Sequence, residues 1–222
     1  MPTWDEIFKQ GKYIRGGTSE YVYDFAYIIK DEFKDEDLKI WDVGCGAGRH
    51  TVFFARYGFN TYATDISENG IKLTKKWLDK ENVSTHLKVA DVTESPWRDI
   101  KFHGILSWNV LQHMSIKDFS KRIEILKASI IPNGLILLSL ISNKAQDYGM
   151  GEKIEKNSFI HTEGLEKGVI HHYFEEDELK TYFKGWKLRI FIEKIEHIEI
   201  AIHKRLQFPL RNAHFIICAQ KK

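Results

Sequence analysis

Apolar residues recur along this chain in two alternating patterns, and together these patterns predict the order of its strands and helices. Short runs rich in β-branched and aromatic residues predict strands, and apolar residues at helical spacing predict helices between them. The predicted strands are 38–43, 60–64, 85–90, 102–107 and 135–141, and the predicted helices are 49–57, 68–80 and 116–129. This alternation is typical of an α/β fold with a doubly wound parallel sheet and helices on both faces.

The two ends of the chain differ from its alternating centre. In residues 1–37 the pattern predicts an N-terminal helical segment, which we interpret as a cover for a ligand. The segment Gly16–Glu20 interrupts the helical pattern and can cap a helix over 21–33. Residues 142–174 have no clear periodicity and exceed most loops of a compact domain, so we interpret them as a lid insertion. The remaining predicted elements are a helix over 175–183, extended segments over 186–196 and 198–203, and a last strand over 214–219.

Composition indicates one ordinary globular domain over residues 1–222. The chain is 43% hydrophobic and 29% charged, and no repeat or linker indicates a second domain. Its net charge of +2 supplies no large positive field, which disfavours general nucleic-acid binding. Cys45 and Cys218 are too few for a disulfide framework, which fits a cytoplasmic protein. No leader pattern and no bilayer-length apolar run is present, so we expect neither secretion nor membrane insertion.

The first candidate for chemistry is the glycine-rich segment 41–49, in which an apolar strand runs directly into Gly44, Gly46 and Gly48 and then into a helix. Glycine lets a ligand approach the main chain, and a helix start supplies unpaired N–H groups. The third glycine of the dinucleotide pattern G-x-G-x-x-G would fall at Arg49, so the spacing argues against an ordinary pyrophosphate site.

Two acidic residues follow the next two strands. Asp65 ends the second strand about twenty residues after the first glycine, where a carboxylate can accept both hydroxyls of a ribose. Asp91 follows the third strand, where it could bond an adenine amine while Val92 packs on the ring. Because parallel strands end at one edge of their sheet, the glycine turn and both acids are predicted to meet at one nucleoside site.

These motifs resemble those of class I S-adenosylmethionine-dependent methyltransferases, most closely the small-molecule and tellurite-resistance-like types. The resemblance rests on DVGCGAG over 42–48, Asp65, Ala90-Asp91-Val92 and ILSWNVL over 105–111, and it covers residues 40–141. It implies a Rossmann-like sheet of seven mostly parallel strands with an antiparallel last strand. In the turn before the fifth strand, Asn133 replaces the more usual glycine.

The resemblance also implies a cofactor and the residues that bind it. The turn would surround the methionine part of S-adenosylmethionine, the acid after the second strand would hold the ribose, and the residues after the third strand would meet the adenine. The product would be S-adenosylhomocysteine. The implied cofactor-binding residues are Asp42, Gly44, Cys45, Gly46, Gly48, Asp65, Ile66, Asp91, Val92 and Asn109.

Histidines are the candidates on the acceptor side. His113 follows the fourth strand and could act as a general base, although positioning alone can carry much of a methyl transfer. His171, His172 and Tyr173 are candidates for the substrate pocket. We predict no metal, because adjacent histidines point in different directions and make poor ligands by themselves.

The acceptor is predicted to be a small molecule. The run N-P-P-Y, which in the family accompanies methylation of planar amides and base amines, is absent after the fourth strand, where Ser107-Trp108-Asn109-Val110 stands instead. Three alternatives remain: a nicotinamide-dependent dehydrogenase, a non-catalytic adenosyl-binding protein, and an RNA methyltransferase using the basic residues 203–205 with Arg211. The sequence indicates neither the acceptor atom nor the oligomeric state.

Overall fold

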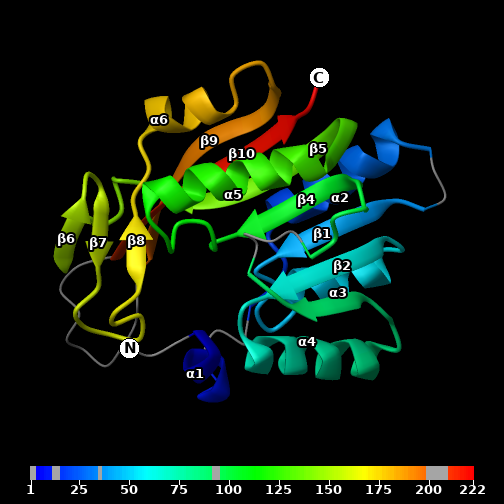
Figure 1. Cartoon of the computed structure of the whole chain (residues 1–222), viewed down its shortest axis with the longest axis horizontal. Helices are drawn as coiled ribbons and strands as arrows, with labels where there is room; N and C mark the ends of the chain where they lie inside the picture. Colours follow the sequence, from blue (N-terminus) through cyan, green and yellow to red (C-terminus); the bar gives the residue numbers. More distant parts are fainter. Residues whose placement is uncertain (1–3, 12–15, 35–36, 92–95, 199–209) are drawn as a thin grey trace.

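The computed structural model describes residues 4–11, 16–34, 37–91, 96–198 and 210–222 (Figure 1). Seven strands form the main sheet in the order β3-β2-β1-β4-β5-β10-β9. Strands β1 to β5 pair in parallel, and β10 is antiparallel to both of its neighbours. The strands are β1 (Lys39–Val43), β2 (Asn60–Asp65), β3 (His86–Val89), β4 (Phe102–Trp108), β5 (Ile130–Ile141), β9 (Lys187–Ile198) and β10 (Leu210–Gln220). The predicted fold class is therefore confirmed.

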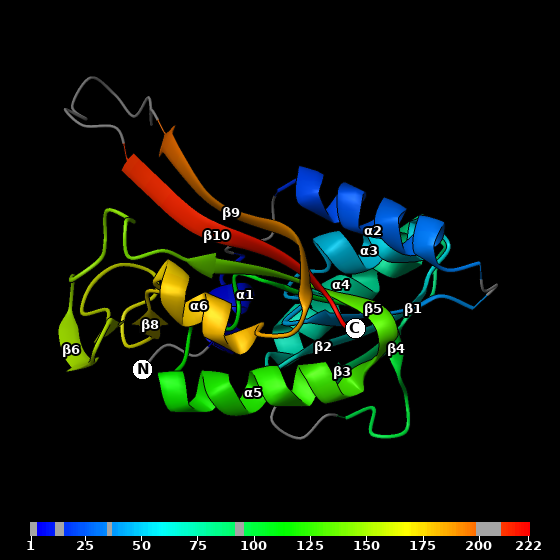
Figure 2. The ribbon, with the colours of Figure 1, turned by 90° about the horizontal axis from the view of Figure 1, so that it is seen from above.

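Helices cover both faces of this sheet, as Figure 2 shows for α2 and α3 on one side and α5 and α6 on the other. Successive side chains of β5 point to opposite faces, as the pleat of a strand requires. Leu135 and Leu137 pack with α2 and α3, whereas Ile136 and Leu138 pack with α5 and α6. The described helices are α1 (Trp4–Lys9), α2 (Glu20–Glu32), α3 (Arg49–Arg56), α4 (Glu68–Glu81), α5 (Ile116–Ser129) and α6 (Glu176–Tyr182).

Several predicted boundaries shift in the last third of the chain. Strand β5 begins at Ile130, five residues before the prediction, because Ile130 already pairs with Phe102 of β4. The pairing register then shifts before Leu135, and Asn133, at a φ of 63°, lies in this irregular stretch. Strand β9 continues to Ile198, which is the only described residue of the extended segment predicted over 198–203. The basic residues 203–205 also lie outside the described residues, and Arg211 belongs to β10.

Helix α1 holds the start of the chain against the carboxyl ends of the parallel strands. The Asp5 carboxylate accepts hydrogen bonds from the Ser67 hydroxyl at 2.7 Å and from the Asn69 N–H at 2.8 Å, both at the start of α4. Figure 1 shows α1 below the ends of β1 and β2. Ser19 stands at the N-cap of α2, but its side chain makes no capping bond. No described helix has the length and apolarity to cross a bilayer.

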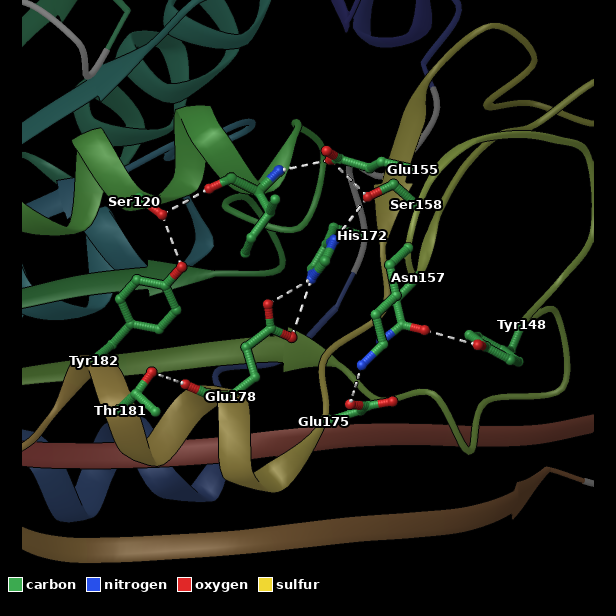
Figure 3. A network of polar contacts seen from close by, with 12 residues as sticks. Ser120, Tyr148, Glu155, Asn157, Ser158, His172, Glu175, Glu178, Thr181 and Tyr182 are labelled. Atoms are coloured by element: carbon green, nitrogen blue, oxygen red, sulfur yellow. Dashed lines mark hydrogen bonds and ion pairs between the residues drawn. The ribbon is translucent and has the colours of Figure 1, made fainter.

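Residues 142–174 form a second, three-stranded antiparallel sheet of β6 (Glu152–Glu155), β7 (Ser158–Ile160) and β8 (Ile170–His172). Strands of three or four residues are too short to show a periodicity, which explains why the sequence pattern missed them. Polar contacts fasten this sheet to the helices: Glu155 accepts from the Ile116 N–H at 2.8 Å, and His172 lies between Ser158 and Glu178 (Figure 3).

Candidate functional site

A cavity of about 610 Å³ opens at the carboxyl ends of β1, β2 and β4. The strand order reverses between β1 and β4, which is the place where open α/β sheets bind ligands. The loops after β1 to β4 form one side of the cavity. Helix α1, α5, the segment 142–174 and β10 each contribute one or two residues to the rest, among them Phe8, Arg122, Glu166 and His214.

The glycine turn after β1 forms the floor of the cavity. Gly44, Gly46 and Gly48 have φ values of 73°, 54° and 91°, a region that residues with a Cβ rarely adopt. The N–H groups of Gly44 and Cys45 both donate to the Thr64 carbonyl of β2, at 2.8 and 3.0 Å. A Cβ on Gly44 would lie 2.4 Å from a methyl group of Val110. The turn is therefore held by main-chain bonds and leaves no room for side chains.

Asp65 lies at the end of β2 with its carboxylate fixed toward the turn. Its two oxygens accept hydrogen bonds from the N–H groups of Gly46 and Ser67, both at 2.8 Å. Burial nevertheless raises the pKa of this carboxyl. The next residue, Ile66, also lines the cavity but is largely exposed. Because the donors to this buried carboxylate among the described residues are neutral N–H groups, a cationic or hydroxyl-bearing ligand would complement it.

Asp42 does not line the cavity but lies beneath it, on β1. The Thr51 hydroxyl of α3 donates to its carboxylate at 2.6 Å. Burial raises the pKa of Asp42 to about 6, and the nearby Asp65 adds to that shift. The turn therefore has a second buried acid behind it.

Asp91 lines the cavity after β3, and its carboxylate is already bonded. Both oxygens of Asp91 lie 3.0 Å from Nη2 of Arg122 on α5. The predicted adenine acid thus has a cationic partner that the sequence did not indicate. The other predicted adenine contact, Val92, lies outside the described residues.

Asn109 and His113 line the cavity after β4. Asn109 has a φ of 56°, and its side-chain oxygen accepts from the Ser139 hydroxyl at 2.5 Å. The half-buried ring of His113 lies between Trp4 and His171, with ring centroids 4.8 and 4.6 Å away. Burial lowers the pKa of His113 to about 3, so the imidazole is neutral at pH 7.

None of the predicted pocket residues His171, His172 and Tyr173 is among the described residues that line the cavity. His171 packs behind the cavity wall against Glu166, and the side chains of His172 and Tyr173 turn toward polar partners elsewhere. Figure 3 shows His172 between Ser158 and Glu178, and the Tyr173 hydroxyl donates to the Asp147 carbonyl at 3.1 Å. The residue of this segment that does reach the cavity is Glu166, which the sequence analysis missed.

Other cavity residues were also missed because they meet only in three dimensions. Phe8 of α1 packs on the glycine turn, within 2.9 Å of where a Cβ of Gly46 would be. Buried His50 follows the turn with its Nε2 atom unbonded within the described chain, and burial lowers its pKa to about 3. The i, i+4 spacing of Trp4 and Phe8, which puts both on one helix face, was a signal available in the sequence.

A family model described as a methyltransferase domain matches residues 40–134, which include the glycine turn and the residues after β2 to β4. A curated relative, the mitochondrial ubiquinone biosynthesis O-methyltransferase of Arabidopsis thaliana, is 30% identical over 116 residues. The match covers 51% of this chain and 35% of that relative, so the chain spans about a third of its length.

Solved structures resemble nearly the whole chain. TehB from Haemophilus influenzae superimposes with a TM-score of 0.71 at 21% identity, covering 98% of this chain and 66% of that one. An S-adenosylmethionine-dependent methyltransferase from Methanosarcina mazei gives a TM-score of 0.72 at 19% identity, covering 93% and 99%. At these identities the likeness concerns the fold.

Proposed function

We propose that this chain is a class I S-adenosylmethionine-dependent methyltransferase, which transfers a methyl group from that cofactor to a small-molecule acceptor in the cavity. The observation that carries the proposal is the meeting of the glycine turn, Asp65, Asp91 and Asn109 around one cavity at the switch point of the sheet. The bound cofactor would supply an electrophilic methyl group: the acceptor atom would bond to the methyl carbon in line as the carbon–sulfur bond breaks, with S-adenosylhomocysteine as the leaving group.

In this proposal the residues after β1 to β4 bind the cofactor in the order that the sequence predicts. The turn from Gly44 to Gly48 binds the methionine part, Asp65 and Ile66 the ribose, and Asp91 with Val92 the adenine, while Asn109 contacts the amino-acid end. Asp91 would have to share its carboxylate between Arg122 and the adenine amine, and Asp42 would act from behind the turn.

The charges of the site fit this cofactor. Burial raises the pKa values of Asp42 and Asp65, so a positively charged ligand would stabilise both carboxylates. S-adenosylmethionine carries a sulfonium and an ammonium group, whereas a dinucleotide would bring an anionic pyrophosphate toward the same acids. These two buried carboxylates therefore favour the adenosyl ligand over a nicotinamide cofactor.

The acceptor side of the cavity supports a small substrate. A volume of about 610 Å³ is in the range of single-ligand pockets, and the cofactor would fill much of it. Helix α1 and the segment 142–174 contribute Trp4, Phe8 and Glu166 to the walls, which fits their proposed role as covers that exclude water. The curated relatives are named as O-methyltransferases, so hydroxyl compounds are the first acceptors to test.

We propose that positioning contributes more to the rate than proton transfer. A general base works best with a pKa near the working pH, and burial holds the pKa of His113 at about 3. His113 is therefore better suited to orient an acceptor than to take its proton. The variant His113→Ala is expected to slow turnover and keep cofactor affinity, and unchanged turnover would show that His113 has no role in turnover.

Cys45 and Cys218 are both unpaired, which supports a reducing, cytoplasmic location.

Calorimetric titration of the purified chain with S-adenosylmethionine, S-adenosylhomocysteine and NAD tests the proposal before any acceptor is known. We expect both adenosyl ligands to bind at one site per chain and NAD to give no binding heat. Binding of NAD alone, or of none of the three, would contradict the assignment of the glycine turn. An acceptor screen with the binding-competent protein would then separate an enzyme from a protein that binds the cofactor without consuming it.

A further inference from the structure

Three side chains with metal-ligand chemistry meet at the acceptor side of the cavity. His113 follows β4, Glu166 precedes β8, and His171 lies on β8. One nitrogen from each histidine and one carboxylate oxygen all lie within 4.8 Å of one another. His113 and Glu166 line the cavity, and His171 packs behind them, edge-on to the His113 ring. The group joins two segments that are far apart in the sequence.

The ring of His171 has an acceptor oxygen at each nitrogen. Its Nε2 atom lies 2.6 Å from Oε2 of Glu166, and its Nδ1 atom lies 3.3 Å from the Val169 carbonyl oxygen. A neutral imidazole carries one N–H, so it can donate to only one of these oxygens. Metal-bound histidines commonly donate one ring N–H to a backbone carbonyl, which leaves the other nitrogen to bind the ion. A cation at Nε2 and Glu166 would satisfy both ends of this ring.

His113 is suited to supply a further lone pair. Its Nδ1 atom is buried and has no hydrogen-bond partner of good geometry among the described residues, although the main chains of Asn109 and Ile170 also approach the ring. The ring of His161 stacks on that of His171, with centroids 3.8 Å apart, and so fixes the plane of the His171 ring.

The neighbouring pair His172 and Glu178 is a natural contrast. The Nε2 atom of His172 lies 3.2 Å from both oxygens of Glu178, and its Nδ1 atom lies 2.7 Å from the Ser158 hydroxyl (Figure 3). Because a hydroxyl can donate to Nδ1, a neutral ring with its proton on Nε2 satisfies every partner. No third metal-ligand side chain joins this pair in the described part of the chain. The two adjacent histidines do point apart, as expected, but His171 finds its partners in other segments.

We propose that His113, Glu166 and His171 bind one divalent transition-metal ion of the zinc type at the acceptor side of the cavity. Two imidazoles and a carboxylate form a ligand set that suits Zn²⁺, with a fourth position left open. Tetrahedral ligands at about 2.1 Å from zinc lie about 3.4 Å apart. To hold the ion, the 2.6 Å pair of His171 and Glu166 would open slightly, and any ligand atoms that lie up to 4.8 Å apart would move closer together. The ion would tie the segment 142–174 to the loop after β4, and its open position would take an oxygen, nitrogen or sulfur atom from a ligand in the cavity.

Titration of chelator-treated protein with Co²⁺, followed by visible absorption and then by Zn²⁺ competition, tests this site. We expect one Co²⁺ per chain, visible bands typical of a four- or five-coordinate ion, and displacement by one Zn²⁺. Glu166→Gln keeps the size of the side chain and should weaken Zn²⁺ binding at least 100-fold. Glu178→Gln, the same change in the neighbouring pair, should leave Zn²⁺ binding within about twofold of the parent protein.

His113→Ala provides a second variant, since it removes a cavity-facing ligand. It should also weaken Zn²⁺ binding at least 100-fold, and far-UV circular dichroism confirms that each variant is folded. Absence of Co²⁺ bands in the parent protein would overturn the proposal, and so would an equal loss in Glu166→Gln and Glu178→Gln. Zn²⁺ binding is measured without any adenosyl ligand, so its result is independent of the proposed methyl transfer.

Discussion

The glycine turn after β1 and the small sheet β6-β7-β8 both shape the same cavity, but different groups hold them in place. The turn is fixed by main-chain bonds, such as those from Gly44 and Cys45 to the Thr64 carbonyl, and by glycines at positive φ. The small sheet is fixed by contacts of its own side chains with distant helices: Glu155 of β6 bonds to Ile116 of α5, and His172 of β8 bonds to Glu178 of α6. A wall built from backbone is sensitive to any added side chain, whereas a wall built from side chains is sensitive to the loss of one partner.

The largest effect is expected from an added Cβ in the turn. Gly44→Ala would place a methyl group 2.4 Å from Val110 at a φ of 73°. Overpacking of about 1–3 kcal/mol and about 1 kcal/mol of left-handed strain together predict a loss of about 3 kcal/mol in the free energy of unfolding. Gly149→Ala is the matched control, because Gly149 has a φ of 85° and no atom within 4 Å of an added Cβ. Urea unfolding should show only the strain in the control, and equal losses would refute the crowding argument.

The next largest effect is expected on ligand affinity, which should depend on the turn side of the cavity and not on the small sheet. Asp65→Ala removes the carboxylate that would accept the ribose hydroxyls and that now accepts from Gly46 and Ser67. Calorimetry with S-adenosylhomocysteine should show a loss of about 2–3 kcal/mol in binding free energy. Glu155→Ala in the small sheet is the control and should leave this affinity unchanged. Retained affinity in the Asp65 variant would mean that the nucleoside binds elsewhere.

Stability in acid should also depend on the turn side of the cavity. Burial, with a further contribution from Arg49, lowers the pKa of His50 to about 3. Below pH 6.5 the unfolded chain therefore binds more protons than the folded one. The free energy of unfolding is not reduced by this titration well above pH 6.5, and it falls progressively as the pH drops toward 3. Between pH 6.5 and 5 the loss is about 2 kcal/mol, and the raised pKa of Asp42 offsets about 1 kcal/mol of the total.

His50→Leu removes that titration but keeps the opposite contribution of Asp42. Between pH 6.5 and 5, the net loss of up to about 1 kcal/mol expected in urea unfolding of the parent protein should therefore become a gain of about 1 kcal/mol. The control is His86→Gln on the exposed edge strand β3, which should keep the pH dependence of the parent protein. If both variants behave like the parent, burial of His50 does not govern the acid response.

The turn side was predictable from the sequence because its determinants are local. Gly44, Gly46 and Gly48 mark positive φ values, and Asp65 and Asp91 follow strands whose apolar runs are evident. Most of the acceptor side was not predictable. His113 was named from its place after the fourth strand, but Glu166, which it meets only through the tertiary fold, was not. Strands of three residues carry no periodicity, and the bonds of His172 to Ser158 and Glu178 leave no local pattern.

The smallest effect tests how the small sheet is fastened. Glu155 accepts from the Ile116 N–H, one of the N–H groups at the start of α5 that lack a partner within the helix, and from the Ser158 hydroxyl at 3.0 Å. Glu155→Ala should therefore lower the free energy of unfolding by about 1 kcal/mol and speed proteolysis within residues 142–174. Glu152→Ala, an exposed change on the same strand, should do neither. Equal proteolysis of both variants would show that apolar packing, centred on Phe159 and Tyr173, holds the small sheet without this bond.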